Sequence, residues 1–233
     1  MRIISNSKAH RVLILNAKGG CGKTTIATNL ACQFANENQK TALVDSDPQA
    51  SSTYWLEARP PHMPPIYCVS AYQNNTQVTR TWQLRVPQGT TRVIVDTPAR
   101  LDAMTASRLI KEADTILIPV LASAIDIRAA IQFISTLNKD PEFRRIKHRV
   151  AVLGNRVRKS TKAYAKLQAY LAQLEIPFIT SLRDTQNYVR AAEEGLGVQE
   201  LPYKSAEKDS IQWHTLVRWI EREPTTTEQK VAL

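Results

Sequence analysis

The residue types with the clearest chemical implication lie in one glycine-rich segment, residues 18–25, with the sequence KGGCGKTT. A loop that binds nucleotide phosphates needs glycines that let backbone N–H groups curve around the phosphates, a lysine for the outer phosphates and a hydroxyl for magnesium. Lys23 is the candidate phosphate lysine, and Thr24 and Thr25 carry the candidate hydroxyls. The remaining cofactor-binding candidates are Gly19, Gly20, Cys21 and Gly22. We therefore predict a nucleotide phosphate site at this segment.

The segment lies between a predicted strand and a predicted helix. Residues 11–16, with four apolar residues in a row at 12–15, are typical of a short buried strand. After the segment, apolar side chains recur at helical spacing, namely Ala27, Leu30, Ala31, Phe34 and Ala35. This strand-loop-helix order places the phosphates at the positive end of a helix, which a chance glycine-rich turn would not do.

Two further predicted strands end in carboxylates. Residues 41–44 lead into Asp45 and Asp47, and residues 92–95 lead into Asp96. Each aspartate alone could be a solvated turn residue. Carboxylates close to a phosphate are stable when a metal ion or a polarised water takes up their charge. The three segments in this order therefore favour a nucleotide and Mg²⁺ site.

Lys18 has no role in an ordinary phosphate loop, and with it residues 18–25 resemble the deviant Walker A box of the ParA/MinD family of ATPases. The resemblance implies that ATP and Mg²⁺ are the cofactors and that Lys18 reaches the partner's nucleotide in a homodimer formed on ATP binding. Residues 45–49 are similar to the family's second box, in which Asp47 would position the attacking water. Asp96 would be the Walker B aspartate, with Thr24 and Asp45 also supporting the metal. A second proline normally follows Pro98 in the family, and Ala99 replaces it here.

The resemblance continues more weakly to about residue 222. Residues 113–120 look like the strand and proline after the family's switch region, and residues 150–157 look like the strand whose asparagine contacts adenine, which would be Asn155. Strand patterns alternate with helix patterns throughout, which predicts an α/β fold with a mostly parallel sheet covered by helices on both faces, as in P-loop NTPases. We expect one domain over residues 1–222 and a disordered tail over 223–233.

The cysteines and the apolar runs exclude several classes of protein. Cys21, Cys32 and Cys68 are odd in number and lack CxxC spacing, so they give neither a disulfide framework nor an obvious metal site. Nothing after Cys68 could supply the cluster ligands of nitrogenase iron protein. Cys21 either has a lowered pKa near the helix N-terminus or fills a tight loop. No apolar run approaches the ~18 residues that span a bilayer, which predicts a cytoplasmic protein without stable membrane insertion.

Basic residues predict an acidic partner. The formal net charge is +10, and residues 139–166 contain ten basic residues against two acidic ones. We expect a helix over residues 160–174 with Ala163, Leu167, Tyr170, Leu171 and Leu174 on one face and a basic stripe beside it. Such a charge density favours non-specific DNA, and hence association with the nucleoid, over a merely solvated surface. The candidate DNA contacts are Arg156, Arg158, Lys159, Lys162, Lys166, Arg183, Arg190, Lys204 and Lys208.

The resemblance implies a ParA-type ATPase that positions or segregates a cargo, with a ParB-like or other adaptor protein that stimulates slow hydrolysis. These sequence motifs do not show which cargo is moved, whether a plasmid, a chromosome or a protein organelle such as a carboxysome. A membrane-recruited MinD-like ATPase is one alternative, because Ile211, Leu216, Val217, Ile220 and two tryptophans could form an apolar helical face. We favour packing on the sheet for that helix. An ATP-dependent small-molecule ligase or synthetase of the same fold is the other alternative.

Overall fold

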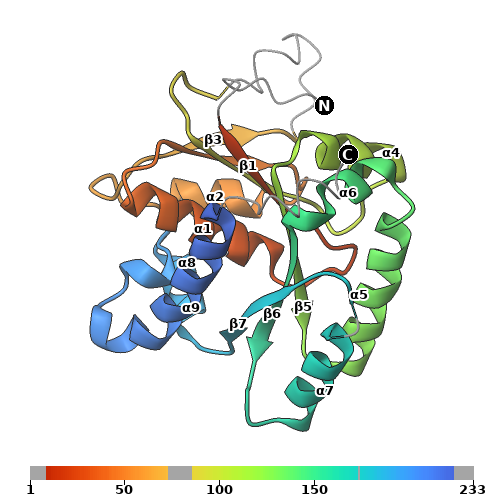
Figure 1. Ribbon diagram of the computed structural model, residues 1–233. Helices are drawn as coiled ribbons and strands as arrows, with labels where there is room; N and C mark the ends of the chain where they lie inside the picture. Colours follow the sequence, from red (N-terminus) through yellow and green to blue (C-terminus); the bar gives the residue numbers. More distant parts are fainter. Residues whose placement is uncertain (1–8, 73–85, 173, 223–233) are drawn as a thin grey trace.

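The computed structural model describes residues 9–72, 86–172 and 174–222, and its centre is a seven-stranded parallel sheet (Figure 1). The strand order is β3-β2-β4-β1-β5-β6-β7. This confirms the predicted α/β class. The strands are β1 (His10–Ile14), β2 (Thr41–Asp45), β3 (Ile66–Ser70), β4 (Arg92–Asp96), β5 (Thr115–Leu121), β6 (Val150–Val157) and β7 (Phe178–Arg183).

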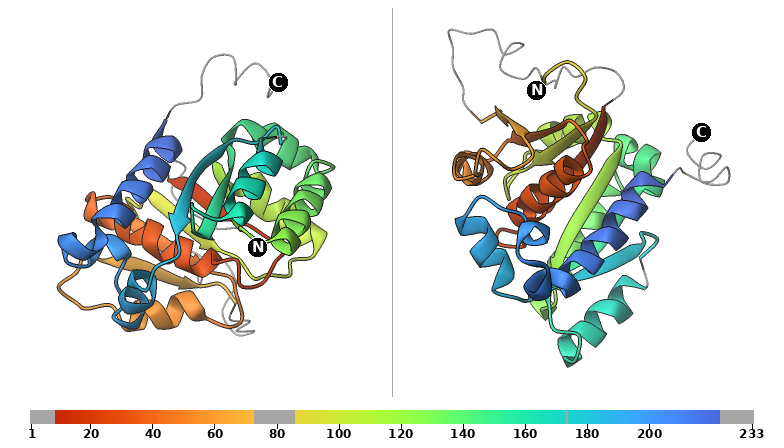
Figure 2. Two further views of the ribbon diagram at one scale, coloured as in Figure 1. Left: turned by 90° about the horizontal axis from the view of Figure 1, so that it is seen from below. Right: turned by 90° about the vertical axis from the view of Figure 1, so that its left-hand side faces the viewer.

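Helices cover both faces of the sheet, as the alternating pattern predicts (Figure 2). One face carries α1 (Lys23–Asn36), α2 (Ser51–Glu57), α8 (Asn187–Glu193) and α9 (Tyr203–Glu221), and the other carries α4 (Ala103–Glu112), α5 (Ala124–Leu137), α6 (Pro141–Ile146) and α7 (Lys162–Leu171). Two 3-10 turns, η1 (Lys147–Arg149) and η2 (Val198–Glu200), complete the connections. Because strands of a parallel sheet are buried on both faces, each face has its own apolar core.

The strand register brings the predicted carboxylates together. In the parallel pairing, Asp45 lies opposite Asp96, and Asp96 lies opposite Ile14, the last residue of β1. All three strands run in the same direction, so their carboxyl ends meet at one edge of the sheet, where ligands bind in open α/β folds. The segment that follows Ile14 is the glycine-rich loop, which therefore lies beside both carboxylates.

Two of the sequence-based helical faces are partly wrong. Helix α7 covers Lys162–Leu171 rather than residues 160–174, and Tyr164 is buried in it while Tyr170 is 47% exposed. Tyr164, Leu167 and Leu171 follow the spacing of three and four residues that defines one helical face, and Tyr170 falls outside it. In α9, Ile211 is 60% exposed, whereas Trp213, Leu216, Val217, Trp219 and Ile220 are buried in the core.

The proline-rich stretch after α2 forms no helix or strand between residues 58 and 65, as its four prolines predict. No helix in the described part of the chain is long and apolar enough to cross a membrane. The tail predicted to be disordered, residues 223–233, lies outside the described residues.

Candidate functional site

The glycine-rich loop has the backbone shape of an anion-binding cradle. Gly20 and Gly22 have φ values of 75° and 93°, in a backbone region that residues other than glycine rarely adopt. Gly22 directly precedes the first turn of α1. Lys23 is 7% exposed, and its ammonium group donates a hydrogen bond to the carbonyl of Lys18 at 3.4 Å. The lysine thus folds back over the loop, where phosphate oxygens would bind. Gly19, Cys21, Thr24 and Thr25 complete the same loop and helix start.

Asn16 holds the beginning of this loop, a role that sequence reasoning missed. Its side-chain amide donates to the Pro119 carbonyl at 2.6 Å, and its side-chain oxygen accepts from the Lys18 N–H at 2.9 Å. The side chain of Lys18 itself is exposed. It is accordingly available to a second molecule, as the role in trans requires. A polar residue at the end of a buried strand, directly before the loop, is the signal that could have identified Asn16.

Asn155 contacts the phosphate loop directly. Its side-chain amide donates to the Cys21 carbonyl at 2.8 Å, and the side chain is 3% exposed. A Cβ at position 22 would lie 2.0 Å from that amide nitrogen, so only glycine fits there. The structure therefore gives Asn155 a role in positioning the loop. Its predicted contact with adenine stays a prediction.

Asp45 and Asp47 shape the loop between β2 and α2. One carboxylate oxygen of Asp45 accepts from the Asp47 N–H at 3.1 Å, and the other accepts from the N–H and the hydroxyl of Thr53, both at 2.9 Å. Asp45 is fully buried, and Asp47 is partly exposed. Asp45 thus positions the segment that carries Asp47. Its support of a metal ion stays a prediction.

Asp96 is the carboxylate best suited to magnesium. One of its oxygens accepts from the Ser52 hydroxyl at 2.7 Å, and the other is buried with no hydrogen-bond partner among the described residues. Burial raises the pKa of Asp96 to about 6, although the nearby hydroxyl groups of Ser52 and Thr24 oppose this rise. An orphaned carboxylate oxygen beside the Thr24 hydroxyl matches the hard oxygen donors that Mg²⁺ prefers, so the residues present fit this ion. Ser52 was missed by the sequence analysis.

Replacing Asp96 by asparagine should stabilise the protein without nucleotide at neutral pH. In the folded state this carboxyl keeps its proton up to about pH 6, whereas in an unfolded chain it titrates near pH ~3.9. Between these values the folded state holds more protons, so the wild-type free energy of unfolding falls as pH rises and stays reduced above the window. A pKa difference of about 2 corresponds to roughly 3 kcal/mol.

Chemical denaturation of both proteins without nucleotide tests this expectation. The variant should be more stable at pH ~7.5, and the gain should disappear by pH ~3, where the wild-type carboxyl is protonated in both states. A variant that is less stable than the wild type at both pH values would show that Asp96 is charged and satisfied in the folded protein.

The structure decides between the two roles that the sequence left open for Cys21, a thiol with a lowered pKa or a small residue that fills a tight loop. Cys21 is 1% exposed, and burial raises its pKa rather than lowering it. Desolvation of the thiolate outweighs the favourable charge of Lys23. Cys21 therefore fills the loop as a small residue.

A pocket of about 360 Å³ opens beside the first turn of α1. Its walls come from α1, α2 and α8, and its lining residues are Thr24, Thr25, Thr28, Asn29, Ser51, Tyr54, Trp55, Ala58 and Ala192. Asn29 ties this wall to η2, because its amide donates to the Thr25 carbonyl at 2.8 Å and its side-chain oxygen accepts from the Val198 N–H at 2.7 Å. The nucleotide-binding end of α1 is thus attached to the segment before α9.

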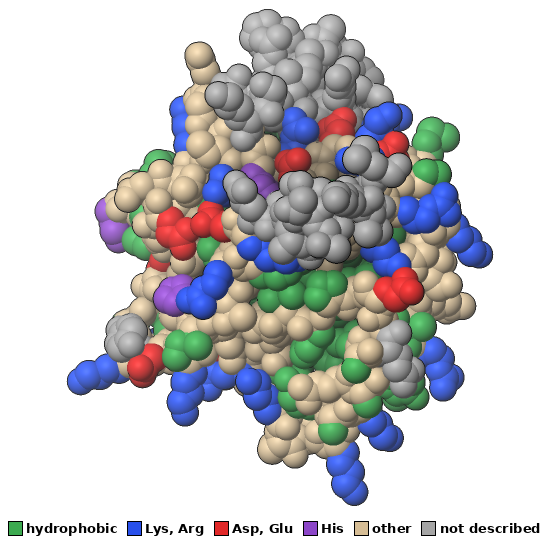
Figure 3. All heavy atoms as spheres, in the orientation of Figure 1, with side chains coloured by type: hydrophobic (Ala, Val, Ile, Leu, Met, Phe, Trp, Pro, Cys, Tyr) green, Lys and Arg blue, Asp and Glu red, His purple; other side chains and the backbone are tan. Residues whose placement is uncertain are grey.

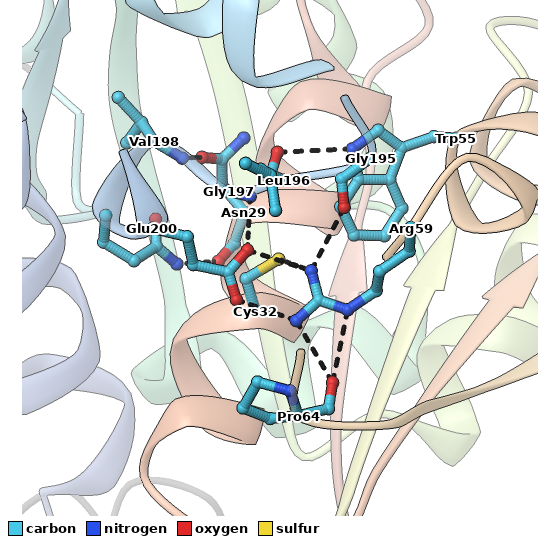
Figure 4. A network of polar contacts seen from close by, with 11 residues as sticks. Asn29, Cys32, Trp55, Arg59, Pro64, Gly195, Leu196, Gly197, Val198 and Glu200 are labelled. Atoms are coloured by element: carbon cyan, nitrogen blue, oxygen red, sulfur yellow. Dashed lines mark hydrogen bonds and ion pairs between the residues drawn. The ribbon is translucent and has the colours of Figure 1, made fainter. Parts of the chain in front are cut away.

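Behind this pocket a buried ion pair joins α2 to the same segment (Figure 4). The guanidinium of Arg59 donates to both carboxylate oxygens of Glu200 at 2.7 and 2.9 Å, and to the carbonyls of Gly195 and Pro64. The two side chains are only 5% and 2% exposed. Burial would raise the pKa of Glu200, but the hydrogen bonds from Arg59 and the Gly197 N–H outweigh it and hold this pKa below its usual value. The proline-rich stretch is therefore anchored to the core at Arg59.

The candidate DNA contacts lie mostly on the surface. Figure 3 shows Lys and Arg side chains along the lower edge of the molecule, where Figure 1 places α7 and the start of α9. Two candidates have acidic partners: Arg183 pairs with the buried Asp209, and the exposed Arg158 pairs with Asp184 at 2.8 Å. Within the described residues no ion pair involves the other seven, which are Arg156, Lys159, Lys162, Lys166, Arg190, Lys204 and Lys208.

Comparison with known proteins agrees with this geometry. The model of the CobQ/CobB/MinD/ParA nucleotide binding domain family matches residues 12–198. The chain is 31% identical over 199 residues to the maintenance of carboxysome distribution protein A of Halothiobacillus neapolitanus, covering 85% of this chain and 90% of that protein. It is 29% identical over 220 residues to the protein of the same name in Gloeobacter kilaueensis, covering 94% and 97%.

Solved structures share the fold. An ATP complex of a Cyanothece McdA variant has a TM-score of 0.66 at 20% identity and covers 94% of this chain and 100% of its own. The MinD cell division protein of Aquifex aeolicus has a TM-score of 0.65 at 19% identity, with 92% and 98% covered. At these identities the likeness establishes the architecture alone.

Proposed function

Because the chain belongs to the CobQ/CobB/MinD/ParA family of nucleotide-binding domains, we propose that it is a ParA-type positioning ATPase that hydrolyses ATP and moves a cargo over the nucleoid. The observation that carries this proposal is the double-lysine loop, with buried Lys23 over it, exposed Lys18 on it and Asp96 beside it. The relatives named for carboxysome distribution cover almost the whole chain, so a protein organelle of that kind is the cargo we favour.

Different residues of the site would bind the phosphates, the metal ion and the attacking water. Backbone N–H groups of the loop and Lys23 would bind the phosphates, while Thr24 and Asp96 would hold the magnesium ion. Bound Mg²⁺ would neutralise charge that develops on the transferred phosphate. Asp47, held by Asp45, would orient the attacking water, and Lys18 would reach the nucleotide of a second copy. ATP would thereby join two molecules, and hydrolysis would separate them again.

Replacing Asp47 by alanine should trap the ATP-bound dimer, because the phosphates remain bound while water loses its orienting group. We expect turnover to fall by about two orders of magnitude, with ATP affinity nearly unchanged. Single-turnover hydrolysis and size-exclusion chromatography with ATP measure the two effects. Turnover equal to that of the wild type would exclude the water-positioning role.

Non-specific DNA is the partner that the unpaired basic residues favour. In such a cycle the dimer and the monomer must differ in affinity for DNA, since a ligand shifts an equilibrium only through differential binding. We expect duplex DNA of arbitrary sequence to bind in the ATP state and to dissociate as salt rises, with a log–log slope that reflects the number of phosphate contacts.

A charge-reversal pair tests this surface. Lys162→Glu with Lys166→Glu should lower DNA affinity in the ATP state by at least about tenfold at moderate salt and flatten the salt slope. The matched control is Lys139→Glu with Arg144→Glu, which makes the same charge change near α6 on another part of the molecule. Equal losses in the two double variants would indicate a general charge effect and not a DNA interface at α7.

The membrane-recruited alternative is less well supported. The apolar residues of α9 that would have to face a bilayer are buried against the sheet, apart from Ile211. Sedimentation with anionic liposomes and ATP checks this, and we expect the protein to stay in the supernatant. An ATP-dependent ligase would instead need a metabolite for turnover, whereas we expect ATP hydrolysis without one.

A further inference from the structure

Arg156 has a backbone conformation that its side chain disfavours. Its φ is 49°, in the left-handed region that side-chain-bearing residues enter rarely. The pairing of β6 with β7 also shifts register between Gly154 and Val157, so a bulge interrupts the ladder here. Strain of this kind persists only where the surrounding structure imposes it. Bulges of this sort occur next to functional sites, where they redirect a side chain.

Asn155 contacts both the phosphate loop and the backbone of this bulge. Its side-chain oxygen accepts from the Arg156 N–H at 3.0 Å, while its amide nitrogen donates to the Cys21 carbonyl at 2.8 Å. One planar amide group thus joins the phosphate loop to the backbone of Arg156. Asn155 and Val157 are buried, whereas the guanidinium-bearing side chain between them is exposed.

We propose, on the basis of the function proposed above, that this bulge couples nucleotide binding in the loop to DNA contact by Arg156. The Cys21 carbonyl and the adjoining Gly22 lie where the loop closes around phosphates, so a change in loop geometry moves the amide of Asn155. That movement changes the backbone of Arg156 and the direction of its charge. Arg156 therefore favours DNA in the triphosphate state, whereas Lys162 contributes its charge in every state.

The coupling is measured by the ratio of DNA affinities with a slowly hydrolysed ATP analogue and with ADP, at low salt and saturating nucleotide. Lys162→Ala is the control, because it removes one charge from the same surface. It shows how far this ratio falls when a dimer loses a DNA contact that does not itself respond to nucleotide. Arg156→Ala should reduce the ratio at least fivefold further than this control. Arg156→Lys, which keeps the charge and the strained position, should restore most of the ratio.

A second measurement needs no DNA. Amide hydrogen exchange over residues 154–158 should slow at least fivefold when the ATP analogue binds to the wild type, and this change should be lost in Asn155→Ala at saturating nucleotide. No change in the wild type would overturn the coupling, even if DNA binds.

The outcomes separate the two proposals. Wild-type DNA binding that depends on nucleotide, combined with equal ratios in Arg156→Ala and Lys162→Ala, overturns the coupling alone. Wild-type DNA binding that is independent of nucleotide overturns the proposed function and the coupling with it.

Discussion

Replacing Lys23 by alanine should abolish nucleotide binding, with a loss in ATP affinity of at least about 100-fold, equivalent to ~2.7 kcal/mol. The buried ammonium group lies over the loop, 3.4 Å from the Lys18 carbonyl, where it would donate charge-assisted hydrogen bonds to phosphate. Because it is desolvated, water cannot replace it effectively once it is removed. Replacing Lys23 by glutamine should lower the affinity for ATP to a similar extent, since glutamine keeps a hydrogen-bond donor but carries no charge.

Isothermal titration with ATP and Mg²⁺ measures this loss. Lys18→Ala is the matched control, because it removes the other lysine of the same loop: the monomer should keep its ATP affinity, while dimer formation is lost. Thermal unfolding without nucleotide should be unchanged by either substitution. Normal ATP affinity in a folded Lys23→Ala protein would refute the phosphate-loop assignment.

Breaking the pair between Arg59 and Glu200 should be the most destabilising single change among those considered. Glu200→Gln leaves a guanidinium buried with no opposite charge beside it, which typically costs about 3–5 kcal/mol. The side chains are 5% and 2% exposed, so solvent screens little of this effect. We expect the loss in the free energy of unfolding, measured by urea denaturation, to fall in this range.

A double-mutant cycle identifies the cause. Arg59→Met with Glu200→Gln should lose much less stability than the sum of the two single variants, because no uncompensated charge remains. Glu175→Gln is the surface control: Glu175 pairs with Lys147 but is 84% exposed, so its replacement should change stability little. Strictly additive losses in the cycle would show that the pair acts only through packing.

The same network ties stability to the nucleotide site. Arg59 follows α2 and Glu200 ends η2, and Asn29 connects η2 to the first turn of α1 (Figure 4). Sequence reasoning identified none of these three residues. Arg59 and Glu200 are separated by 141 positions, and an arginine beside prolines looks like an ordinary exposed loop residue. No local pattern distinguishes a buried charge from a solvated one.

The helical faces show where periodicity is sufficient and where it fails. Leu167 and Leu171 were placed correctly on the buried face of α7, because two leucines four residues apart mark that face. Tyr170 was wrongly placed on that face, and the buried Tyr164 was not identified, because tyrosine is amphipathic and suits either environment. The Ser181 hydroxyl, within hydrogen-bonding distance of the Tyr164 hydroxyl at 3.2 Å, offers the buried tyrosine a partner that only the neighbouring strand supplies.

The sequence by itself determined the phosphate loop, the parallel α/β architecture and the carboxylates at the ends of two further strands. These follow from local chemistry: glycines permit the loop, apolar runs make buried strands, and parallel strands end at one edge. Tertiary structure alone decided which charges are free. Arg183 and Arg158 have acidic partners, Asn155 joins the loop to Arg156, and one oxygen of Asp96 has no donor among the described residues. Burial and pairing depend on segments distant in sequence, and these set the energy of a charge far more than its local context does.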